Sequence, residues 1–300
     1  MKIKKLVAIL FGIALISFGV GLLSLKHYGY KNGIFKIVVD NISEGIREDN
    51  SNEDDSNYVE KNVDEEKIEN VDGINTIDVD VPFLDVNIIP ENRDDVQIHY
   101  NGYIKANFIP KLKTERSSSI LYISLEKKSH VSYNVKKSEA KLDIYIPKTY
   151  EKNIKISTSF GDINIANLNI SQLELNSSYG DIEIKNLNGD IKANVSYGKI
   201  DIENHSGDLT ATTSFGDIDL KYNNFDNNID ATTSYGDIKI ELPKNSQFNI
   251  DANYSFGDID IDFPVTISKS EKNRIAGRVG NSKNSIKLKS DFGDIRIKSK

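Results

Sequence analysis

Apolar and polar residues alternate with a period of two from residue 74 to the end of the chain. In residues 77–81 isoleucine and valine alternate with aspartate, and similar runs lie at residues 96–100, 121–125 and 142–146. Successive side chains of a β-strand point to opposite faces, so this period is typical of strands with one buried face. Because no stretch after residue 74 has the 3.6-residue period of a helix, the pattern predicts an all-β domain over residues 74–300.

An internal repeat of the form S-[FY]-G-D-I-x-I dominates the second half of the chain. Its copies are 18 to 21 residues apart except for a final gap of two periods, and their glycines lie at positions 161, 180, 198, 216, 236, 257 and 293. A weaker half-repeat begins at Gly189 and Gly207. The repeat predicts a parallel β-solenoid with coils of about 18–21 residues, each burying its apolar face against its neighbours. A β-meander with Gly-Asp hairpin turns gives the same alternation and stays an alternative.

The phase of the alternation changes at each Gly-Asp pair, which predicts a corner between two walls of a coil. Residues on both sides of the corner, such as Thr158 and Phe160 before it and Ile163 after it, are then expected to point inward. Stacked coils would place the aromatic residue of every copy in one column inside the core. A surface column that binds sugars or apolar ligands is the alternative. The column consists of Phe160, Tyr179, Tyr197, Phe215, Tyr235, Phe256 and Phe292.

The aspartate after each repeat glycine forms a second expected column, with neighbours about 4.8 Å apart. Like charges at this spacing repel, so we expect each carboxylate to bond the turn, to be well solvated or to be neutralised. Lys199 replaces one aspartate and relieves the repulsion. A calcium-binding repeat is the alternative, but such repeats have more glycines than the single one found here, and we predict no metal site. The aspartates are Asp162, Asp181, Asp217, Asp237, Asp258 and Asp294.

The N-terminal part of the chain has the pattern of a membrane anchor. Residues 6–25 are apolar and uncharged and follow three lysines within residues 1–5. Because a helix of this length spans the roughly 30 Å hydrocarbon core, we predict a single-pass transmembrane helix with residues 1–5 in the cytoplasm. A cleaved signal peptide is the alternative, although no convincing cleavage site follows. The acid-rich residues 26–73 predict an extracytoplasmic linker, or alternatively a cation- or partner-binding tail.

Composition excludes several classes of function. The 300 residues include 45 acidic and 38 basic side chains and no cysteine. The lack of cysteine excludes disulfide frameworks, thiol nucleophiles and cysteine-ligated metals, and the net charge of −7 argues against nucleic-acid binding. No H-E-x-x-H, G-x-S-x-G, phosphate-loop or dinucleotide-binding motif occurs. We therefore predict no catalytic residue and no cofactor.

The repeat copies, the alternation before them and the segment IDVDVPFLDVNIIP at residues 77–90 resemble a known bacterial family. This is the "putative adhesin" family called domain of unknown function 4097, and the resemblance covers residues 74–300. It implies a right-handed parallel β-helix and provides no catalytic residues to carry over. Some members accompany envelope-stress signalling systems, which implies a place at the cell envelope. The chain departs from the regular pattern at Lys199 and in an insertion at residues 266–285.

The outward positions of the repeats predict a charged, elongated outer face that binds an envelope protein or a cell-wall polymer. This indicates a non-enzymatic cell-membrane protein with an extracytoplasmic domain, acting as an adhesin or as an envelope-stress accessory or sensor. A polysaccharide-acting β-helix enzyme and a passive spacer are the alternatives. The end coils have no evident cap beyond the charged tail at residues 296–300, so edge-to-edge dimerisation stays open. The candidate binding residues are Asn164, Glu183, Asp201, Asp219, Lys239 and Asp260, with Arg296 beside them.

Overall fold

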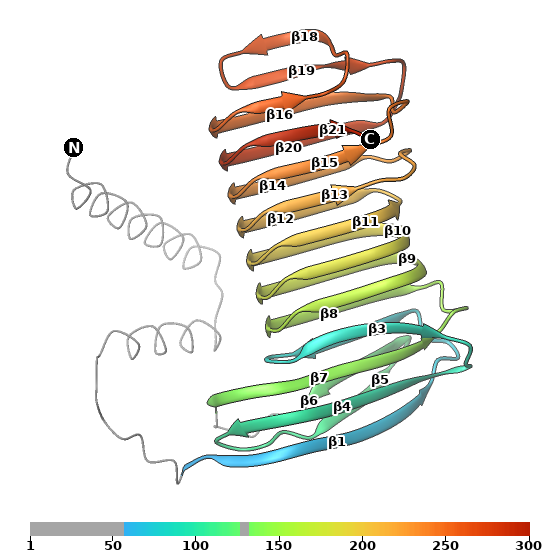
Figure 1. Ribbon diagram of the computed structural model, residues 1–300. Coiled ribbons are helices and arrows are strands. Elements are labelled where there is room, and N and C mark those ends of the chain that lie inside the picture. The colour runs from blue at the N-terminus through green and yellow to red at the C-terminus, as the bar shows by residue number, and fades with distance from the viewer. Residues whose placement is uncertain (1–56, 127–131) are drawn as a thin grey trace, which may run out of the picture. The chain divides into compact units, whose positions relative to one another are not determined.

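The computed structural model describes residues 57–126 and 132–300, which form twenty-one β-strands (Figure 1). The predicted all-β class is confirmed. Successive repeats pair in parallel, as in the alignment of Ile182 with Ile163 on one side and with Ile200 on the other. Parallel pairing of consecutive copies cannot arise from hairpins, so the chain is a solenoid and not a meander. Each coil contributes one segment to each of two walls.

The first wall contains the strands that run up to the Gly-Asp corners, and all its central pairings are parallel. In spatial order it consists of β2 (Thr76–Val81), β8 (Asn153–Phe160), the second half of β9 (Ile163–Tyr179), the second half of β10 (Ile182–Tyr197), β12 (Leu209–Phe215), β14 (Ile229–Tyr235), β20 (Ser285–Phe292) and β16 (Phe248–Phe256).

The second wall contains the strands that leave the corners, and it is parallel in the same way. In spatial order it consists of β7 (Val135–Pro147), β3 (Asp85–Glu91), the first half of β9, the first half of β10, β11 (Ile200–Ser206), β13 (Ile218–Lys221), β15 (Ile238–Leu242), β21 (Ile295–Ser299) and β17 (Ile259–Ile261).

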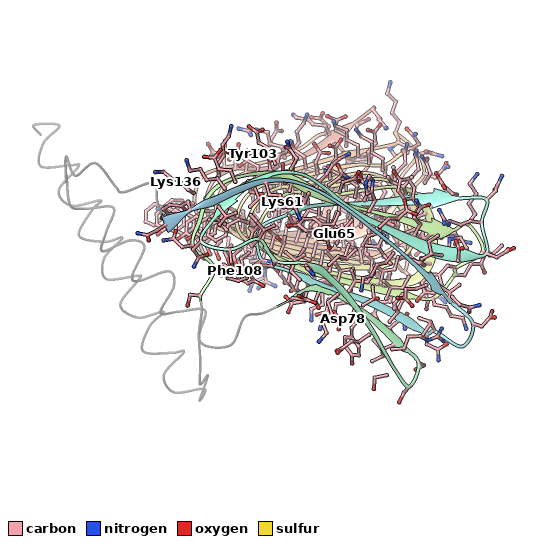
Figure 2. The ribbon with its side chains drawn as sticks, turned by 90° about the horizontal axis from the view of Figure 1, so that it is seen from below. Lys61, Glu65, Asp78, Tyr103, Phe108 and Lys136 are labelled. Atoms are coloured by element: carbon pink, nitrogen blue, oxygen red, sulfur yellow. The ribbon has the colours of Figure 1, made fainter. Side chains whose placement is uncertain are left out.

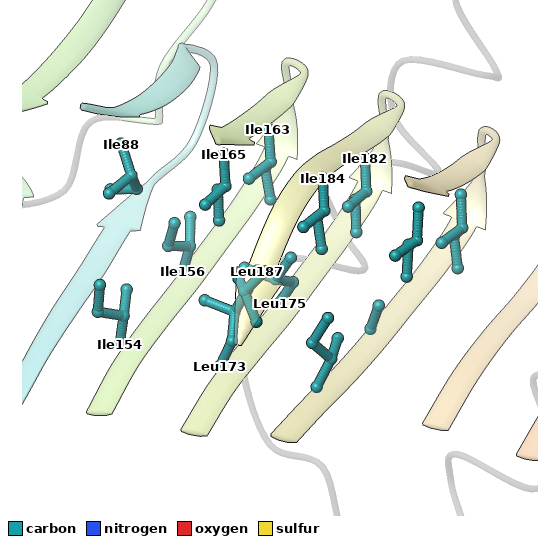
Figure 3. Packing of buried hydrophobic residues seen from close by; sticks show 14 of the residues in the cluster. Ile88, Ile154, Ile156, Ile163, Ile165, Leu173, Leu175, Ile182, Ile184 and Leu187 are labelled. Atoms are coloured by element: carbon teal, nitrogen blue, oxygen red, sulfur yellow. The ribbon is translucent and has the colours of Figure 1, made fainter. Parts of the chain in front are cut away.

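Columns of isoleucine and leucine fill the space between the walls. On the second wall Ile163, Ile182 and Ile200 are in register and have no exposed surface. On the first wall Ile154 and Leu173 form a matching inward column (Figure 3). Burying a side chain of this size contributes about 1.5–3 kcal/mol. Since only neighbouring coils provide that cover, the stack of coils stabilises itself.

The coils do not follow chain order at the C-terminal end of the stack. β20 pairs in parallel with β14 on one side and β16 on the other, and β21 pairs likewise with β15 and β17. The last coil, residues 285–299, is therefore inserted between the coils at 229–242 and 248–261 (Figure 1). The gap of two periods in the glycine spacing corresponds to the excursion that the chain makes before it returns.

That excursion is a hairpin that caps the first wall. β18 (Thr266–Glu271) and β19 (Arg274–Val279) pair antiparallel, and β19 pairs antiparallel with β16. The Arg274 guanidinium adds an ion pair with Asp251, at 2.8 and 2.6 Å. The prediction that only the charged tail could cap this end is wrong, because Ile295–Ser299 forms β21 inside the stack.

Antiparallel strands also cap the N-terminal end of the stack. β4 (Asp95–Ala106) pairs with β7, β1 (Val59–Asn70) pairs with β4, and β5 (Leu112–Ser117) pairs with β6 (Ile120–Leu125), which lies beside β2. Figure 2 looks onto this end, where β1 with Lys61 and Glu65 crosses in front of the coils. The Glu65 carboxylate accepts the backbone N–H of Leu112 at 2.9 Å, so β1 protects the edge of β5.

The strand β1 corrects the predicted linker. Residues 59–70 belong to the acidic segment that the sequence analysis assigns to a solvated linker at 26–73, yet all twelve pair with β4. The composition of a segment indicates how much apolar surface it can bury, but it does not show whether the backbone of the segment pairs with a neighbouring strand. The predicted transmembrane helix at 6–25 and the linker up to residue 56 lie outside the described residues. Within the described ranges the structure has no helix long and apolar enough to span a bilayer.

Candidate functional site

The Gly-Asp corner is built by close backbone approach between coils. At Gly198 φ is +155°, and a Cβ atom there would lie 2.2 Å from the carbonyl oxygen of Gly180 in the neighbouring coil. No side chain fits at that distance, and L residues rarely adopt this backbone conformation. The repeat therefore needs glycine at the corner, as the phase change in the sequence predicts.

The aspartate column bonds the turns, as one of the three predicted arrangements requires. Asp162 Oδ1 accepts the backbone N–H of Asp181 at 2.8 Å, and Asp181 Oδ1 accepts the N–H of Lys199 at 2.7 Å. The same bond recurs from Asp237 to Asp294 at 2.8 Å and from Asp294 to Asp258 at 2.9 Å. Each carboxylate thus joins two coils, and the described residues contain no group of three or more acidic or histidine side chains that could hold a metal.

The half-repeat builds the opposite corner with the same device. Asp190 Oδ1 accepts the backbone N–H of Asp208 at 2.9 Å, and Asp208 Oδ1 accepts that of Asn228 at 3.0 Å. Asn228 Oδ1 in turn accepts the N–H of Ser285, the first residue of the inserted coil, at 3.0 Å. Both edges of the solenoid therefore carry ladders of side-chain acceptors.

Lys199 neutralises carboxylates on the outer side of the corner. Its Nζ lies 2.6 Å from Asp219 Oδ2 and 3.0 Å from Asp201 Oδ2. The hydrogen bonds to Asp219 and Asp201 raise the pKa of the Lys199 ammonium despite its partial burial. Lys199 thus interrupts the aspartate column, but its ammonium pairs with acids of the neighbouring outer face and not with members of that column.

The aromatic column lies on the surface, so the prediction that it belongs to the core is wrong. Its seven rings stack in one ladder with centroids 4.8–5.0 Å apart and planes within 8° of parallel. Phe160 is 47% exposed and Phe256 is 66% exposed. The inward place nearest the corner instead holds a small residue such as Thr213, whose Oγ donates to the carbonyl of Gly198 at 3.1 Å. Walls that converge at a corner leave room inside only for small side chains.

The ladder geometry also argues against the sugar-stacking alternative. A sugar ring packs on the face of an aromatic ring. Neighbouring rings of the ladder cover each other's faces, and mainly ring edges meet the solvent. The ladder is therefore an apolar ribbon along the corner and not a row of open stacking platforms.

The predicted binding residues do form one column on the outer face of the second wall, which we call the outer-face column. Their strands are in register, so neighbours in the column are adjacent across the sheet. Because the last coil is inserted, Arg296 lies between Lys239 and Asp260. In spatial order the column consists of Asn164, Glu183, Asp201, Asp219, Lys239, Arg296 and Asp260.

Ion pairs accompany the charges of this column. Lys239 Nζ lies 2.5 Å from Glu241, and Lys298 Nζ lies 2.6 Å from Asp260. The Arg296 guanidinium contacts Asp237 at 2.7 Å. The column therefore carries a stretch of three acids from Glu183 to Asp219, followed by two basic residues. Because lysines of the domain pair with all three acids, a partner would meet a surface of paired charges and not an uncompensated acidic stretch.

A groove of about 450 Å³ opens at the N-terminal end of the outer-face column. Asn164 and Glu183 line it together with Lys141, Asp143 and Tyr145. It lies where β3 and β9 part, since their pairing ends at Ile88 and Ile165 while β3 continues along β7. Both strands break the simple alternation there, β3 at Ile88-Ile89 and β9 after Ile165, but the sequence alone does not show that these breaks lie side by side.

Asp143 is the buried carboxylate of the groove, and sequence reasoning missed it. Lys141 Nζ lies 2.8 Å from its Oδ2, and the Asn87 amide donates to its Oδ1 at 2.7 Å. Burial tends to raise the pKa of the Asp143 carboxyl, but hydrogen bonds from Lys141, Asn87 and Asn101 outweigh it and hold the pKa below its usual range. The group therefore stays ionised and works as a hydrogen-bond acceptor.

Comparison with known families agrees with this architecture. The family model described as Toastrack DUF4097 matches residues 74–195 and 190–298. The chain belongs to the Toastrack DUF4097 family. The sequence resemblance to this family is thereby confirmed, and no curated protein matches the chain.

Solved structures resemble this Toastrack protein at low identity. A "putative cell adhesion protein" from Clostridium sporogenes is 18% identical, with a TM-score of 0.35 over 80% of this chain and 100% of its own. A "putative adhesin" from Bacteroides fragilis is 15% identical, with a TM-score of 0.38 over 78% of this chain and 97% of its own. A "putative adhesin" from Parabacteroides merdae is 13% identical, with a TM-score of 0.27 over 78% of this chain and 95% of its own.

The carboxyl groups of the Toastrack domain whose pKa values are shifted share one direction of shift. Each described carboxyl with a shifted pKa is shifted downward, as at Asp143, Asp237 and Asp251. At Asp251 the hydrogen bond from Arg274 is the main cause, whereas at Asp237 the N–H of Asp294 and the Arg296 guanidinium outweigh partial burial. A carboxyl that acts as a general acid near neutral pH needs the opposite shift.

Proposed function

We propose that this protein is a non-enzymatic, single-pass membrane protein whose extracytoplasmic Toastrack domain binds an envelope partner through the outer-face column. The observation that carries the proposal is the register of the column, which aligns seven predicted residues on one rigid wall. A right-handed coil and an N-terminal anchor at residues 6–25 are parts of the same proposal. The role is that of an adhesin or of an accessory or sensor for envelope stress.

Three features support a binding role over catalysis. The column is continuous over seven coils, which suits contact with an elongated protein or polymer. Its charges are held in place by ion pairs, so the surface is ordered before a partner arrives. The downward pKa shifts of the carboxyls favour acceptors over acids.

Photo-crosslinking in intact cells tests the proposal. A photoreactive amino acid is placed at position 183, 219 or 260 of the full chain, and captured products are identified by mass spectrometry. Positions 192 and 210 are matched controls, because Lys192 and Thr210 lie on the outer side of the first wall and are exposed. The proposal predicts one shared product from the three test positions and none of it from the controls.

The kind of product separates the roles. A specific envelope protein supports the accessory or sensor role, and wall polymer supports the adhesin role. Equal capture from both walls, or capture from neither, contradicts the proposal and favours the passive spacer.

A further inference from the structure

Three loops meet at the corner of the half-repeat and enclose a second pocket, which shares no residue with the outer-face column. They are residues 222–228 between β13 and β14, residues 243–247 between β15 and β16, and residues 280–284 between β19 and β20. The third loop reaches this place only because the last coil is inserted between two earlier ones. The pocket has a volume of about 310 Å³, at the small end of the range for ligand sites.

The lining of this loop pocket is rich in amide groups and contains one charged side chain, the carboxylate of Asp226. Amide side chains of Asn224, Asn245, Gln247 and Asn281 line it, and Phe225 provides an apolar surface. Among the residues that the structure describes, no lysine or arginine lines it. An amide offers both a donor and an acceptor, which matches a hydroxyl group that also offers both.

Contacts between the loops hold the pocket in shape. Gln247 Oε1 accepts the backbone N–H of Asn281 at 3.0 Å, and the Asn284 amide donates to Asp226 Oδ1 at 3.0 Å. The Phe225 ring packs edge-on against Phe248, with centroids 6.2 Å apart and planes at 90°. The three loops are therefore tied to one another before a ligand arrives, which lowers the entropy cost of ordering their backbone.

Some polar groups in the pocket lack partners within the described part of the chain. The side chains of Asn224 and Asn245 make no hydrogen bond there, and both residues are exposed. Ser246 also lines the pocket, and its buried Oγ has no hydrogen-bond partner. The two exposed amides are available to a ligand that brings hydroxyls, whereas the Ser246 Oγ is enclosed by the protein.

We propose that the loop pocket binds one neutral saccharide ring. Such a ring has an apolar face for Phe225 and hydroxyls for the surrounding amides. An anionic ligand would find no cation in the lining, and a metal ion would find only the single carboxylate of Asp226. The volume and the amide-rich lining, in which Asp226 is the single charged residue, together favour one sugar unit over an anionic or larger ligand.

Saturation-transfer NMR with the full chain tests this site. The chain is held in a zwitterionic detergent that contains no sugar, and the probes are the methyl glycosides of glucose, galactose, mannose and N-acetylglucosamine. We expect transfer to at least one glycoside and about fivefold weaker binding for each of Asn224→Ala and Asn245→Ala, since each removes one hydrogen bond. Lys244→Ala is the matched control, because Lys244 is exposed on the same loop outside the lining and should leave binding unchanged.

Two results would overturn the proposal. One is no transfer to any of the four glycosides at about 10 mM, where even weak sites are occupied. The other is transfer that persists unchanged in the Asn224→Ala/Asn245→Ala double variant while circular dichroism shows an intact fold. The variant Glu183→Lys should leave transfer intact, because Glu183 belongs to the outer-face column and does not line the loop pocket.

Discussion

Gly216→Ala, which adds one methyl group at a corner of a central coil, should be strongly destabilising. The glycine has φ of +154°, and a Cβ atom would lie 2.0 Å from the carbonyl oxygen of Gly198 in the neighbouring coil. That oxygen cannot easily retreat, because it accepts the Thr213 hydroxyl at 3.1 Å. The Gly216 N–H is itself bonded to the carbonyl of Tyr235 at 2.9 Å on the other side.

The magnitude follows from the contacts that must give way. A positive φ costs an alanine about 1–2 kcal/mol. Separating the corners enough to admit a methyl group weakens two or three hydrogen bonds, each with a net contribution of about 1 kcal/mol. We expect a total loss of about 3–5 kcal/mol, a large fraction of the 5–15 kcal/mol that is typical of folded domains.

Urea unfolding of the full chain, followed by far-ultraviolet circular dichroism, measures this loss. Gly73→Ala is the control, because Gly73 also has a positive φ, +74°, but a Cβ there meets no atom within 4 Å. It should lose only the cost of the positive φ, about 1–2 kcal/mol. Equal losses in the two variants would refute the reasoning, because the close approach between coils would then contribute nothing.

Three further predictions concern the ladders and ion pairs. Asp181→Ala should cost about 1 kcal/mol in urea unfolding through loss of the bond to the Lys199 N–H, and Asp181→Asn, which keeps an acceptor, should restore it. Arg296→Met should make the free energy of unfolding depend less steeply on pH under acidic conditions. The lowered pKa of Asp237 gives stability that is present above about pH 3.9 and is lost as the pH falls through the folded-state pKa. An unchanged pH dependence in the variant would contradict this. Phe215→Ala should cost roughly twice as much as Phe256→Ala, about 2 against 1 kcal/mol, because Phe215 stacks between two rings and Phe256 against one; equal costs would contradict it.

The repeat predicts the corners and walls because each copy carries its own local signals. Gly-Asp marks the corner, and the parity of isoleucine marks the inward face, as Ile182 and Ile200 confirm. The parity argument fails at the aromatic residue, because it takes no account of the walls converging at the corner. Phe160 is the last residue of β8, where the space inside admits only small side chains, and its ring lies on the surface.

Long-range order is the part that local patterns do not encode. The strands β16 and β20 have the same alternation, so nothing in either shows that β20 is inserted next to β14. The sequence of β1 likewise does not show its partner: its acidic composition is that of a linker, and only the folded structure shows that it pairs with β4. The loop pocket was missed for this reason, although the asparagine-rich loops at 222–228 and 280–284 were visible as breaks in the alternation.

A signal in the half-repeat could have been used. Asn186 and Asn204 adopt left-handed φ values of 53° and 56°, and the Asn204 amide donates to Asn186 Oδ1 at 3.0 Å. Asparagine tolerates this conformation better than most residues. An asparagine that recurs three residues before each half-repeat glycine therefore predicts a second bend in the coil.

The central claim is that the outer-face column binds a partner along its length. The most direct measurement is the yield of the product captured from position 219 in cells that express the variants Glu183→Gln, Asp201→Asn, Lys239→Met and Asp260→Asn, singly and combined. We predict graded losses that accumulate as substitutions are added, because several coils share the contact. An unchanged yield in the fourfold variant would contradict the claim.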